Sequence, residues 1–283
     1  MNGPSSRLPP AHVFLTRRMR VLATELAATL PRVRGRTDAD GIHDMRVAIR
    51  RLRVLLRVAR PVFGRFHCDA VRASLARVGR ASGALRDEEV LRETLTGLEL
   101  RSRELDAWIV RRARREEALR RIVESRLRAG QLARPLRELR ALLVLPVRPN
   151  RRRPVAAFAH KAAGRARRDV ERKLGARTDD ALALHELRIA YKRLRYTTEI
   201  FRDALPLEVA ELATPAARFQ KRLGAIHDLD VARVVIARTR SLSPASKERV
   251  LAAIARARTA EVERYLAENG SSVRKLDDRA EPL

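Results

Sequence analysis

The apolar residues of this chain recur at spacings of three and four along almost its whole length, and alternation over more than four residues is hard to find. This spacing matches the turn of an α-helix, whereas a half-buried strand alternates at every second residue. Aromatic residues, which favour strands, make up only 4% of the chain. The sequence therefore predicts an all-α protein. Breaks in the pattern, mostly at proline and glycine, predict helices at about 11–30, 40–60, 67–83, from 86, 102–129, 132–145, 155–174, 180–203, 206–224, 226–240 and 244–268.

A proline-rich segment divides the chain of 283 residues, which is long enough for about two units of ordinary domain size. Residues 146–154, PVRPNRRRP, hold three prolines and are interpreted as a linker. We predict a first helical half at 9–145 and a second at 155–268. The ends, 1–8 and 269–283, are predicted to be disordered.

An internal repeat relates the two predicted halves. The segment HDMRVAIRRLRVLLRV (43–58) matches HELRIAYKRLRYTTEI (185–200) at six of sixteen positions. A second echo follows each copy, GALRDEEV at 83–90 and GAIHDLDV at 224–231. Both echoes keep their order at nearly the same spacing, which indicates that one helical unit was duplicated.

Helix geometry gathers the basic side chains of each copy on one narrow face. At about 100° per residue, an arc of about 80° holds five residues of the first copy: His43, Arg46, Arg50, Arg53 and Arg57. The second copy repeats this stripe one position shorter, because Glu199 replaces the last arginine: His185, Arg188, Lys192 and Arg195. The opposite face is apolar and is predicted to be core: Met45, Ala48, Ile49, Leu52, Leu55, Leu56 and Ala59, then Leu187, Ala190, Tyr191, Leu194 and Phe201.

The stripes have two interpretations. A solvated helix face is the simpler one, but such faces normally mix charges of both signs and gain from pairs four residues apart. These stripes carry one sign and are bordered by branched apolar residues such as Val54 and Ile189. That arrangement favours the wall of a groove that binds an extended anion.

The second echo is also open to two interpretations. Gly83 and Gly224 could each end a helix, with Asp87 and Asp228 capping the next one. Alternatively, its carboxylates could support the groove by holding arginine side chains in place: Asp87, Glu89, Asp228 and Asp230.

The charge balance indicates a polyanionic partner. Lys and Arg number 62 against 34 Asp and Glu, which gives a formal net charge of +28. Genomic base composition could explain the preference for arginine over lysine, but not an excess of positive charge that repels itself in the folded state. The planar fork of arginine also suits phosphate oxygens.

Composition also argues against several classes of site. The single cysteine, Cys68, excludes an internal disulfide framework and a cysteine-rich zinc site. Neither His43 nor His185 has a histidine or cysteine at ligand spacing, so we expect no metal and no other cofactor. No apolar run approaches the roughly 18–20 residues that span a bilayer, and the N-terminus lacks the pattern of a signal peptide. We therefore expect a soluble cytoplasmic protein without a membrane partner.

The repeated motif resembles a known family. His-x-x-Arg-[Val/Ile]-Ala-x-[Arg/Lys]-Arg-Leu-Arg occurs twice and is followed by Arg-Asp-x-[Asp/Glu]-Val or His-Asp-Leu-Asp-Val, a combination that is similar to the CHAD (conserved histidine α-helical domain) family. The resemblance covers about 10–268. It implies two pseudo-symmetric four-helix bundles with a basic groove or channel, binding of inorganic polyphosphate, and location at polyphosphate granules.

Position by position, the resemblance assigns phosphate binding to both stripes and adds Arg51 and Arg193, which lie off the stripes. Other basic residues are expected to join, the last two as weaker candidates: Arg17, Arg18, Lys161 and Arg165, then Lys221 and Arg222. Glu199 departs from an all-basic stripe.

Some members of the family also carry a triphosphatase domain with a Glu-x-Glu-x-Lys strand. The nearest match here, at 261–265, has tyrosine in place of lysine, so no such domain is expected.

Three functions follow as hypotheses. A non-enzymatic polyphosphate-binding module leads, because a narrow cationic groove reads no bases and the chain has few aromatic residues. Nucleic-acid binding is the alternative, since phosphate contacts dominate affinity there too, although single-strand binders use aromatic stacking platforms. A phosphohydrolase, or an accessory to one, is a further alternative that would need a nucleophile or metal-binding carboxylates near the stripes.

Overall fold

The computed structural model describes residues 8–35, 40–98, 100, 102–146 and 154–277, and within these ranges it contains helices and no strands. The prediction of an all-α protein is confirmed. A single isolated bridge joins Pro10 and Pro154. None of the helices in the described ranges combines the length and the apolar character needed to cross a membrane. The elements are α1 (Ala11–Gly35), α2 (Gly41–Phe63), α3 (Arg65–Ala81), α4 (Gly83–Thr96), α5 (Arg103–Arg128), α6 (Ala133–Val144), α7 (Val155–Glu171), α8 (Ala181–Ile200), η2 (Arg202–Ala204), α9 (Leu207–Ala210), α10 (Ala213–Arg238) and α11 (Pro244–Asp277).

The chain folds as two compact units that are discontinuous in sequence. Unit 1 comprises the described residues of Met1–Arg86, Ala118–Asp169 and Arg193–Thr214, and unit 2 those of Asp87–Glu117, Val170–Lys192 and Pro215–Leu283. Each unit therefore draws residues from both predicted halves. The duplication and the division at 9–145 and 155–268 stay predictions, and most of the predicted linker 146–154 lies outside the described residues, as does nearly all of 1–8.

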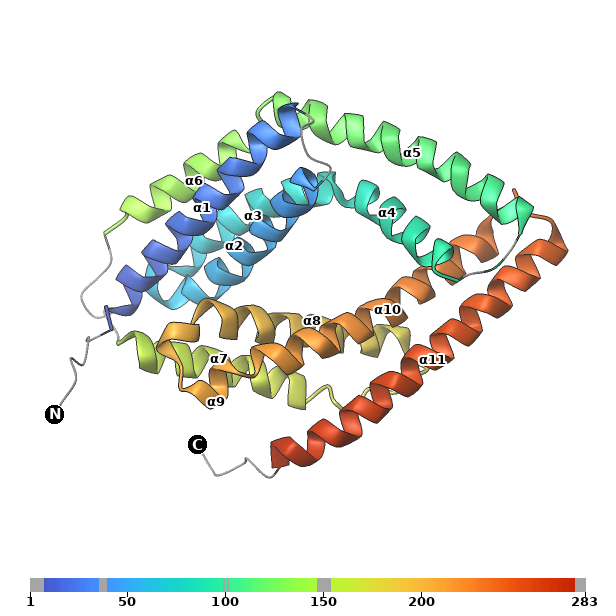
Figure 1. Ribbon diagram of the computed structural model, residues 1–283. Helices are drawn as coiled ribbons and strands as arrows, with labels where there is room; N and C mark the ends of the chain where they lie inside the picture. Colours follow the sequence, from blue (N-terminus) through green and yellow to red (C-terminus); the bar gives the residue numbers. More distant parts are fainter. Residues whose placement is uncertain (1–7, 36–39, 99, 101, 147–153, 278–283) are drawn as a thin grey trace. The chain divides into compact units, whose positions relative to one another are not determined.

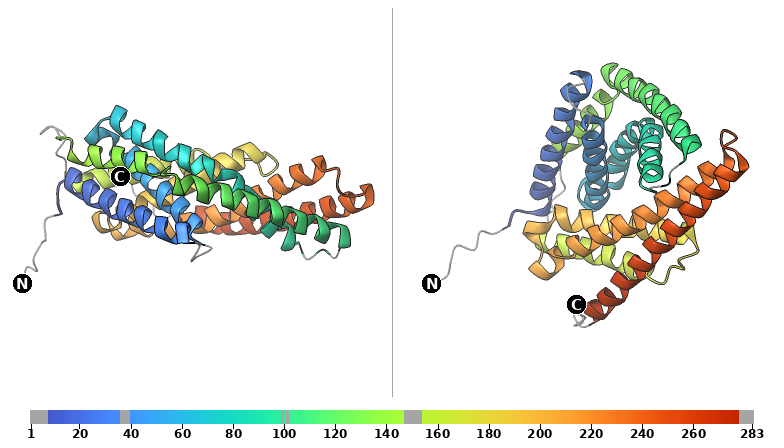
Figure 2. Two further views of the ribbon diagram at one scale, coloured as in Figure 1. Left: turned by 90° about the horizontal axis from the view of Figure 1, so that it is seen from above. Right: turned by 45° about the vertical axis from the view of Figure 1, so that its right-hand side comes forward.

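The core of unit 1 is built on α2. Figure 1 shows α1, α2, α3 and α6 packed side by side, and they stay adjacent in the views of Figure 2. The apolar arc predicted for α2 is buried throughout, which confirms that face as core: Met45, Ala48, Ile49, Leu52, Leu55, Leu56 and Ala59. Because this face is buried, the basic stripe on its far side is held at the unit surface.

Unit 2 has its own core, contributed by α4, α5, α10 and α11. Trp108 of α5 is buried there, and its Nε1 donates a hydrogen bond to Thr239 Oγ1 at 3.2 Å. A second apolar contact stacks Tyr191 of α8 on Phe219 of α10, with ring centroids 5.0 Å apart, and Tyr265 of α11 meets the edge of Phe219. These contacts determine which side of α8 packs against α10 in unit 2.

Two prolines fail to end their helices. The sequence pattern stops the first helix before Pro31 and the second before Pro61, but α1 and α2 both continue beyond them. A proline inside a helix removes a hydrogen bond and costs about 3 kcal/mol. The residues that follow these prolines include buried side chains: Val33 in α1, and Val62 and Phe63 in α2. Because burying one such side chain contributes about 1.5–3 kcal/mol, tertiary packing offsets the cost.

The capping interpretation of the second echo is wrong for Gly224 and for both aspartates. α10 runs through Gly224 without a break, which places Asp228 inside the helix, and Ile226 and Leu229 beside it are buried. In the first echo α3 does end just before Gly83, but Gly83 is itself the first residue of α4, which places Asp87 inside that helix. The glycines with positive φ in the described ranges are instead Gly64 and Gly130. Burial of one continuous helix face, which the local sequence does not reveal, decides these boundaries.

The last helix is longer than predicted. The pattern places its end at 268 and a disordered tail at 269–283, but α11 continues to Asp277, and only 278–283 lie outside the described residues. A single internal glycine, here Gly270, costs about 1 kcal/mol relative to alanine. That cost is too small to stop a helix that is already propagating.

Candidate functional site

The first stripe lies along α2 in unit 1. His43, Arg53 and Arg57 are the more exposed members of this stripe, and Arg46 and Arg50 are more deeply buried. Arg50 Nη1 approaches the hydroxyl of Tyr196 on α8 at 3.4 Å. The residues predicted to share one face therefore do so, but their contacts differ from one to the next.

Arg46 is anchored in the fold. Its Nη1 donates hydrogen bonds to the carbonyl oxygen of Ser82 at 2.7 Å, to Ser82 Oγ at 2.8 Å and to the carbonyl oxygen of Gly79 at 3.2 Å. These acceptors lie at the C-terminal end of α3, where backbone carbonyls lack helical partners and cations are favoured. Arg46 therefore ties α2 to the end of α3.

Arg53 faces other arginines. Partial burial and then the charges of Arg72, Arg80 and Arg50 lower the pKa of its guanidinium. Arg72 lies beside it on α3 and donates from Nε to the carbonyl oxygen of Arg53 at 3.1 Å. Arg72 and Arg80 were not selected from the sequence. Around the axis of α3 the two residues are about 80° apart, so they share one side of the helix. This shared side is the sequence signal that could have identified them.

Arg57 lies in a similar environment. Partial burial and the charges of Arg193, Arg72 and Arg60 lower its pKa, and Asp169 opposes the shift. Arg193 donates to Asp169 at 3.0 Å. We call the group that these contacts bring together in unit 1 the arginine cluster: Arg50, Arg53, Arg57, Arg72, Arg80 and Arg193.

Carboxylates neutralise only part of the arginine cluster. Arg72 pairs with Asp69 at 2.8 Å, and Arg193 with Asp169. Within the described part of the chain, Arg53, Arg57 and Arg80 form no ion pair. Like charges held together with part of their hydration removed oppose folding unless an anion joins them. The cluster therefore has the electrostatics of an anion site.

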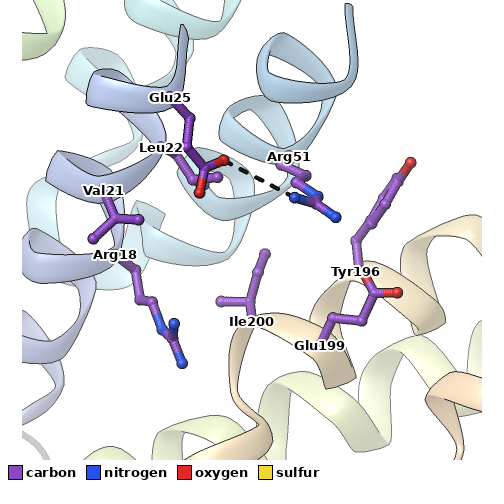
Figure 3. Close-up of a pocket in the computed structure, with 8 residues that line it drawn as sticks. All are labelled: Arg18, Val21, Leu22, Glu25, Arg51, Tyr196, Glu199 and Ile200. Atoms are coloured by element: carbon purple, nitrogen blue, oxygen red, sulfur yellow. Dashed lines mark ion pairs between the residues drawn. The ribbon is translucent and has the colours of Figure 1, made fainter. Parts of the chain in front are cut away.

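Arg51 lies in a different setting. It lines a pocket of about 260 Å³ in unit 1, and its Nη1 is 3.9 Å from Glu25 Oε2 (Figure 3). The pocket combines two arginines, two glutamates, a tyrosine and apolar residues: Arg18, Val21, Leu22, Glu25, Arg51, Tyr196, Glu199 and Ile200. Its mixed charge contrasts with the single sign of the arginine cluster.

Glu199 neutralises the end of the second stripe. Arg195 donates from Nε to Glu199 Oε1 at 2.7 Å and lies over the ring of Tyr196. Arg18 similarly pairs with Asp203 at 2.6 Å. The other predicted residues of the first helices are exposed: Arg17 in α1, and Lys161 and Arg165 in α7.

The rest of the second stripe belongs to unit 2. His185, Arg188 and Lys192 are partly buried on α8. His185 meets His227 of α10, with ring centroids 4.6 Å apart and a tilt of 47°. Burial and the charges of Arg188 and Lys192 lower the pKa of His185, and burial, Arg188 and His185 lower that of His227 to about 4. His227 was not selected as a site residue, although its place in the second echo is a signal.

Two more predicted residues lie on α10. Lys221 is exposed. Arg222 pairs with Glu268 at 2.9 Å and with Glu261 at 3.4 Å, both on α11. Arg222 therefore links α10 to α11 and does not extend a single-sign stripe.

One of the predicted supporting carboxylates holds an arginine that lies outside the stripes. Asp230 is buried and accepts from Arg258 of α11 at 2.7 Å. In α4 the buried acid is Glu88, which pairs with Arg112 and Arg115 of α5 at 2.8 and 2.9 Å. Asp87 is exposed, and Glu89 and Asp228 are partly buried.

Among the described residues, no group of three or more His, Cys, Asp or Glu side chains could hold a metal ion. Cys68 is buried, and burial raises the pKa of its thiol to about 11.

Comparison with known proteins decides the family. The CHAD domain profile matches residues 18–237, which is well over half of the chain and includes both copies of the motif. The chain belongs to the CHAD domain family. The resemblance seen in the repeated motif is confirmed.

Solved structures share the fold of this CHAD domain. The crystal structure of the CHAD domain from the plant Ricinus communis matches with a TM-score of 0.74 and 22% identity, over 91% of this chain and 89% of that one. PptA from Streptomyces chartreusis matches with a TM-score of 0.66 and 19% identity, over 94% of this chain and 99% of that one. The search of functionally curated proteins found no match.

Proposed function

We propose that this CHAD domain binds inorganic polyphosphate and catalyses no reaction on it. The observation that carries the proposal is the arginine cluster, in which Arg53 and Arg57 face further arginines and have lowered pKa values. Such a cluster is stabilised when a bound anion supplies the missing negative charge. Family membership supports the same ligand, because the motif resemblance implies polyphosphate.

The chemistry of the ligand matches the cluster. Polyphosphate is a linear chain in which every phosphate unit carries negative charge and exposes oxygens on all sides. Arginine presents several N–H donors in a planar fork and binds such oxygens in pairs. Arg50, Arg53 and Arg57 follow one another at one-turn spacing along α2, so they offer donors at regular intervals to an extended chain.

The aromatic residues favour polyphosphate over single-stranded nucleic acid. Proteins that bind single strands without sequence preference stack bases on exposed aromatic rings. All ten aromatic residues of this chain are described, and eight are buried. Phe158 is partly buried, and only Phe66 is largely exposed. The arginine cluster therefore lacks the stacking platforms that base recognition needs.

A competition experiment tests the choice of ligand. Fluorescent linear polyphosphate bound to the full chain is challenged with single-stranded DNA, duplex DNA or RNA at equal phosphate concentration and about 0.15 M salt. We expect polyphosphate to resist displacement by each nucleic acid. Displacement by any of them at comparable phosphate concentration would refute a specific polyphosphate site and favour general phosphate-backbone binding.

The proposal has two further parts. Incubation of the pure protein with polyphosphate and Mg²⁺ or Mn²⁺ should release no phosphate, and release at a steady rate would show a phosphohydrolase instead.

In cells, a fluorescent fusion of the chain should gather at polyphosphate granules. A diffuse signal in cells that contain granules would refute that location.

A further inference from the structure

The His185–His227 contact is a pair of imidazoles in unit 2 with one incompletely bonded nitrogen. The two rings, from α8 and α10, lie 4.6 Å apart between centroids and are tilted by 47°. His185 Nδ1 is buried and has no hydrogen-bond partner. A buried polar atom without a partner costs about 1–3 kcal/mol. The pair therefore retains capacity for a proton or a ligand.

Two cations and two carboxylates face the pair, and the cations have the larger effect on its pKa values. From α8, Arg188 and Lys192 face it, together with Glu186, which pairs with Lys173 at 2.7 Å. From α10, Asp230 faces His227 but accepts hydrogen bonds from Arg258 of α11. Both carboxylates are thus partly neutralised by other cations. In the free protein this environment disfavours a charged imidazole.

The first repeat differs at one of these two positions. His43 takes the place of His185, but Arg86 takes the place of His227 in the echo GALRDEEV. Arginine stays charged at all physiological pH values, whereas histidine changes charge within that range. The chain thus carries one copy with a permanent charge at this position and one with a titratable group.

We propose that the His185–His227 pair takes up a proton when polyphosphate binds beside Arg188 and Lys192, so that this stretch of α8 binds polyphosphate more tightly at acid pH. The inference rests on the proposed polyphosphate binding. The proton comes from solvent, and the resulting imidazolium adds a charged donor for a phosphate oxygen.

The sign of the pH dependence follows from linkage. In the free protein the pKa of His227 is lowered to about 4 by burial, Arg188 and His185. A bound polyanion offsets the nearby cations and raises that pKa. Between the two values the complex is protonated and the free protein is not, so affinity increases as the pH falls. For one proton taken up, the gain reaches about tenfold per pH unit at most.

Calorimetry measures this proton uptake directly. Linear polyphosphate of narrow length distribution is titrated into the full chain at about pH 6 and about pH 8, in buffers with different heats of ionisation. We expect a net uptake at the lower pH that falls away at the higher one. Since the ligand is the same for every variant, a difference in proton uptake between variants comes from the protein and not from the polyphosphate.

Two substitutions and one control assign the uptake. His227→Arg gives the second copy the residue of the first, and should remove most of the uptake while keeping tight binding at about pH 8. His227→Gln should also remove the uptake and covers the case in which arginine does not fit the site. His67→Gln removes an exposed histidine of α3 in unit 1 and should leave the uptake unchanged.

The outcomes separate the two proposals. Polyphosphate binding with the same proton uptake in the wild type and in both His227 variants would overturn this inference alone. Absence of polyphosphate binding at every pH would overturn the proposed function, and this inference with it. Circular dichroism of each variant confirms that helicity is retained.

Discussion

Arg46 and Arg53 lie two turns apart on the same face of α2, yet their environments give them opposite effects on stability. Arg46 donates to Ser82 and Gly79 at the end of α3, whereas Arg53 faces other arginines. Arg46→Ala should lower stability by about 1–3 kcal/mol, because it removes charged hydrogen bonds to partly buried acceptors. Arg53→Ala should leave the melting temperature unchanged or higher, because it removes repulsion.

Thermal unfolding of both single variants checks this contrast, and polyphosphate titration of Arg53→Ala checks that binding weakens while stability does not. If Arg53→Ala destabilised the protein as much as Arg46→Ala, the arginine cluster would be a network that stabilises the fold and not an anion-binding site.

His227 contributes, together with His185, to the acid response of the free protein. Its pKa of about 4, set by burial, Arg188 and His185, lies below the roughly 6.5 of an unfolded chain. Between these values the unfolded chain binds a proton that the folded protein does not, so stability falls as the pH drops from about 6.5 to about 4. His227→Gln should flatten this part of the curve, as measured by melting temperature against pH. His67→Gln serves as the control, and parallel curves for all three proteins would contradict the assignment.

At the scale of elements, two glycines should respond in opposite ways to substitution by alanine. Gly64 joins α2 to α3 with φ 89°, a conformation that costs an alanine roughly 1–2 kcal/mol. Gly224 lies inside α10, and a Cβ there would meet nothing within 4 Å. Gly64→Ala should therefore lower the denaturation midpoint. Gly224→Ala should raise stability by about 1 kcal/mol, because alanine favours a helix over glycine.

Chemical denaturation of the two variants measures both effects. A loss of stability in Gly224→Ala would indicate that the helix is interrupted there after all, as the local sequence suggests. An unchanged midpoint in Gly64→Ala would mean that the turn relaxes around the new side chain.

The sequence predicted faces of helices better than it predicted their ends. The core arc of α2 follows from helical period alone, because every residue from Met45 to Ala59 has its angle set by its position. The ends depend on tertiary burial, which local sequence does not contain. Pro31 and Pro61 therefore appeared to be stops, although buried side chains after them extend both helices.

At the scale of the whole molecule, the site was predictable within one helix but not between helices. The repeated motif placed Arg50, Arg53 and Arg57 together on α2. The contribution of Arg72 and Arg80 required knowledge that α3 packs beside α2. In the same way, the fold buries Glu88 rather than the acids beside it. The two discontinuous units likewise depend on contacts between distant segments.

The central claim is that polyphosphate binds at the arginine cluster and not to positive charge in general. Two matched double variants of unit 1 test it. Arg53→Ala with Arg57→Ala removes two charges from the cluster on α2, and Arg137→Ala with Arg140→Ala removes two exposed charges from α6. The variants have equal net charge and equal numbers of substitutions, so only the position of the lost charges differs.

Polyphosphate titration of both variants at several salt concentrations is the decisive measurement. We predict that the α2 variant weakens binding about tenfold or more, and that the slope of log affinity against log salt falls by about 1–2. The α6 variant should keep nearly wild-type affinity and slope, because exposed charges outside the cluster contribute only through screened attraction. Equal weakening in the two variants would contradict the account and show that binding is diffuse over the basic surface.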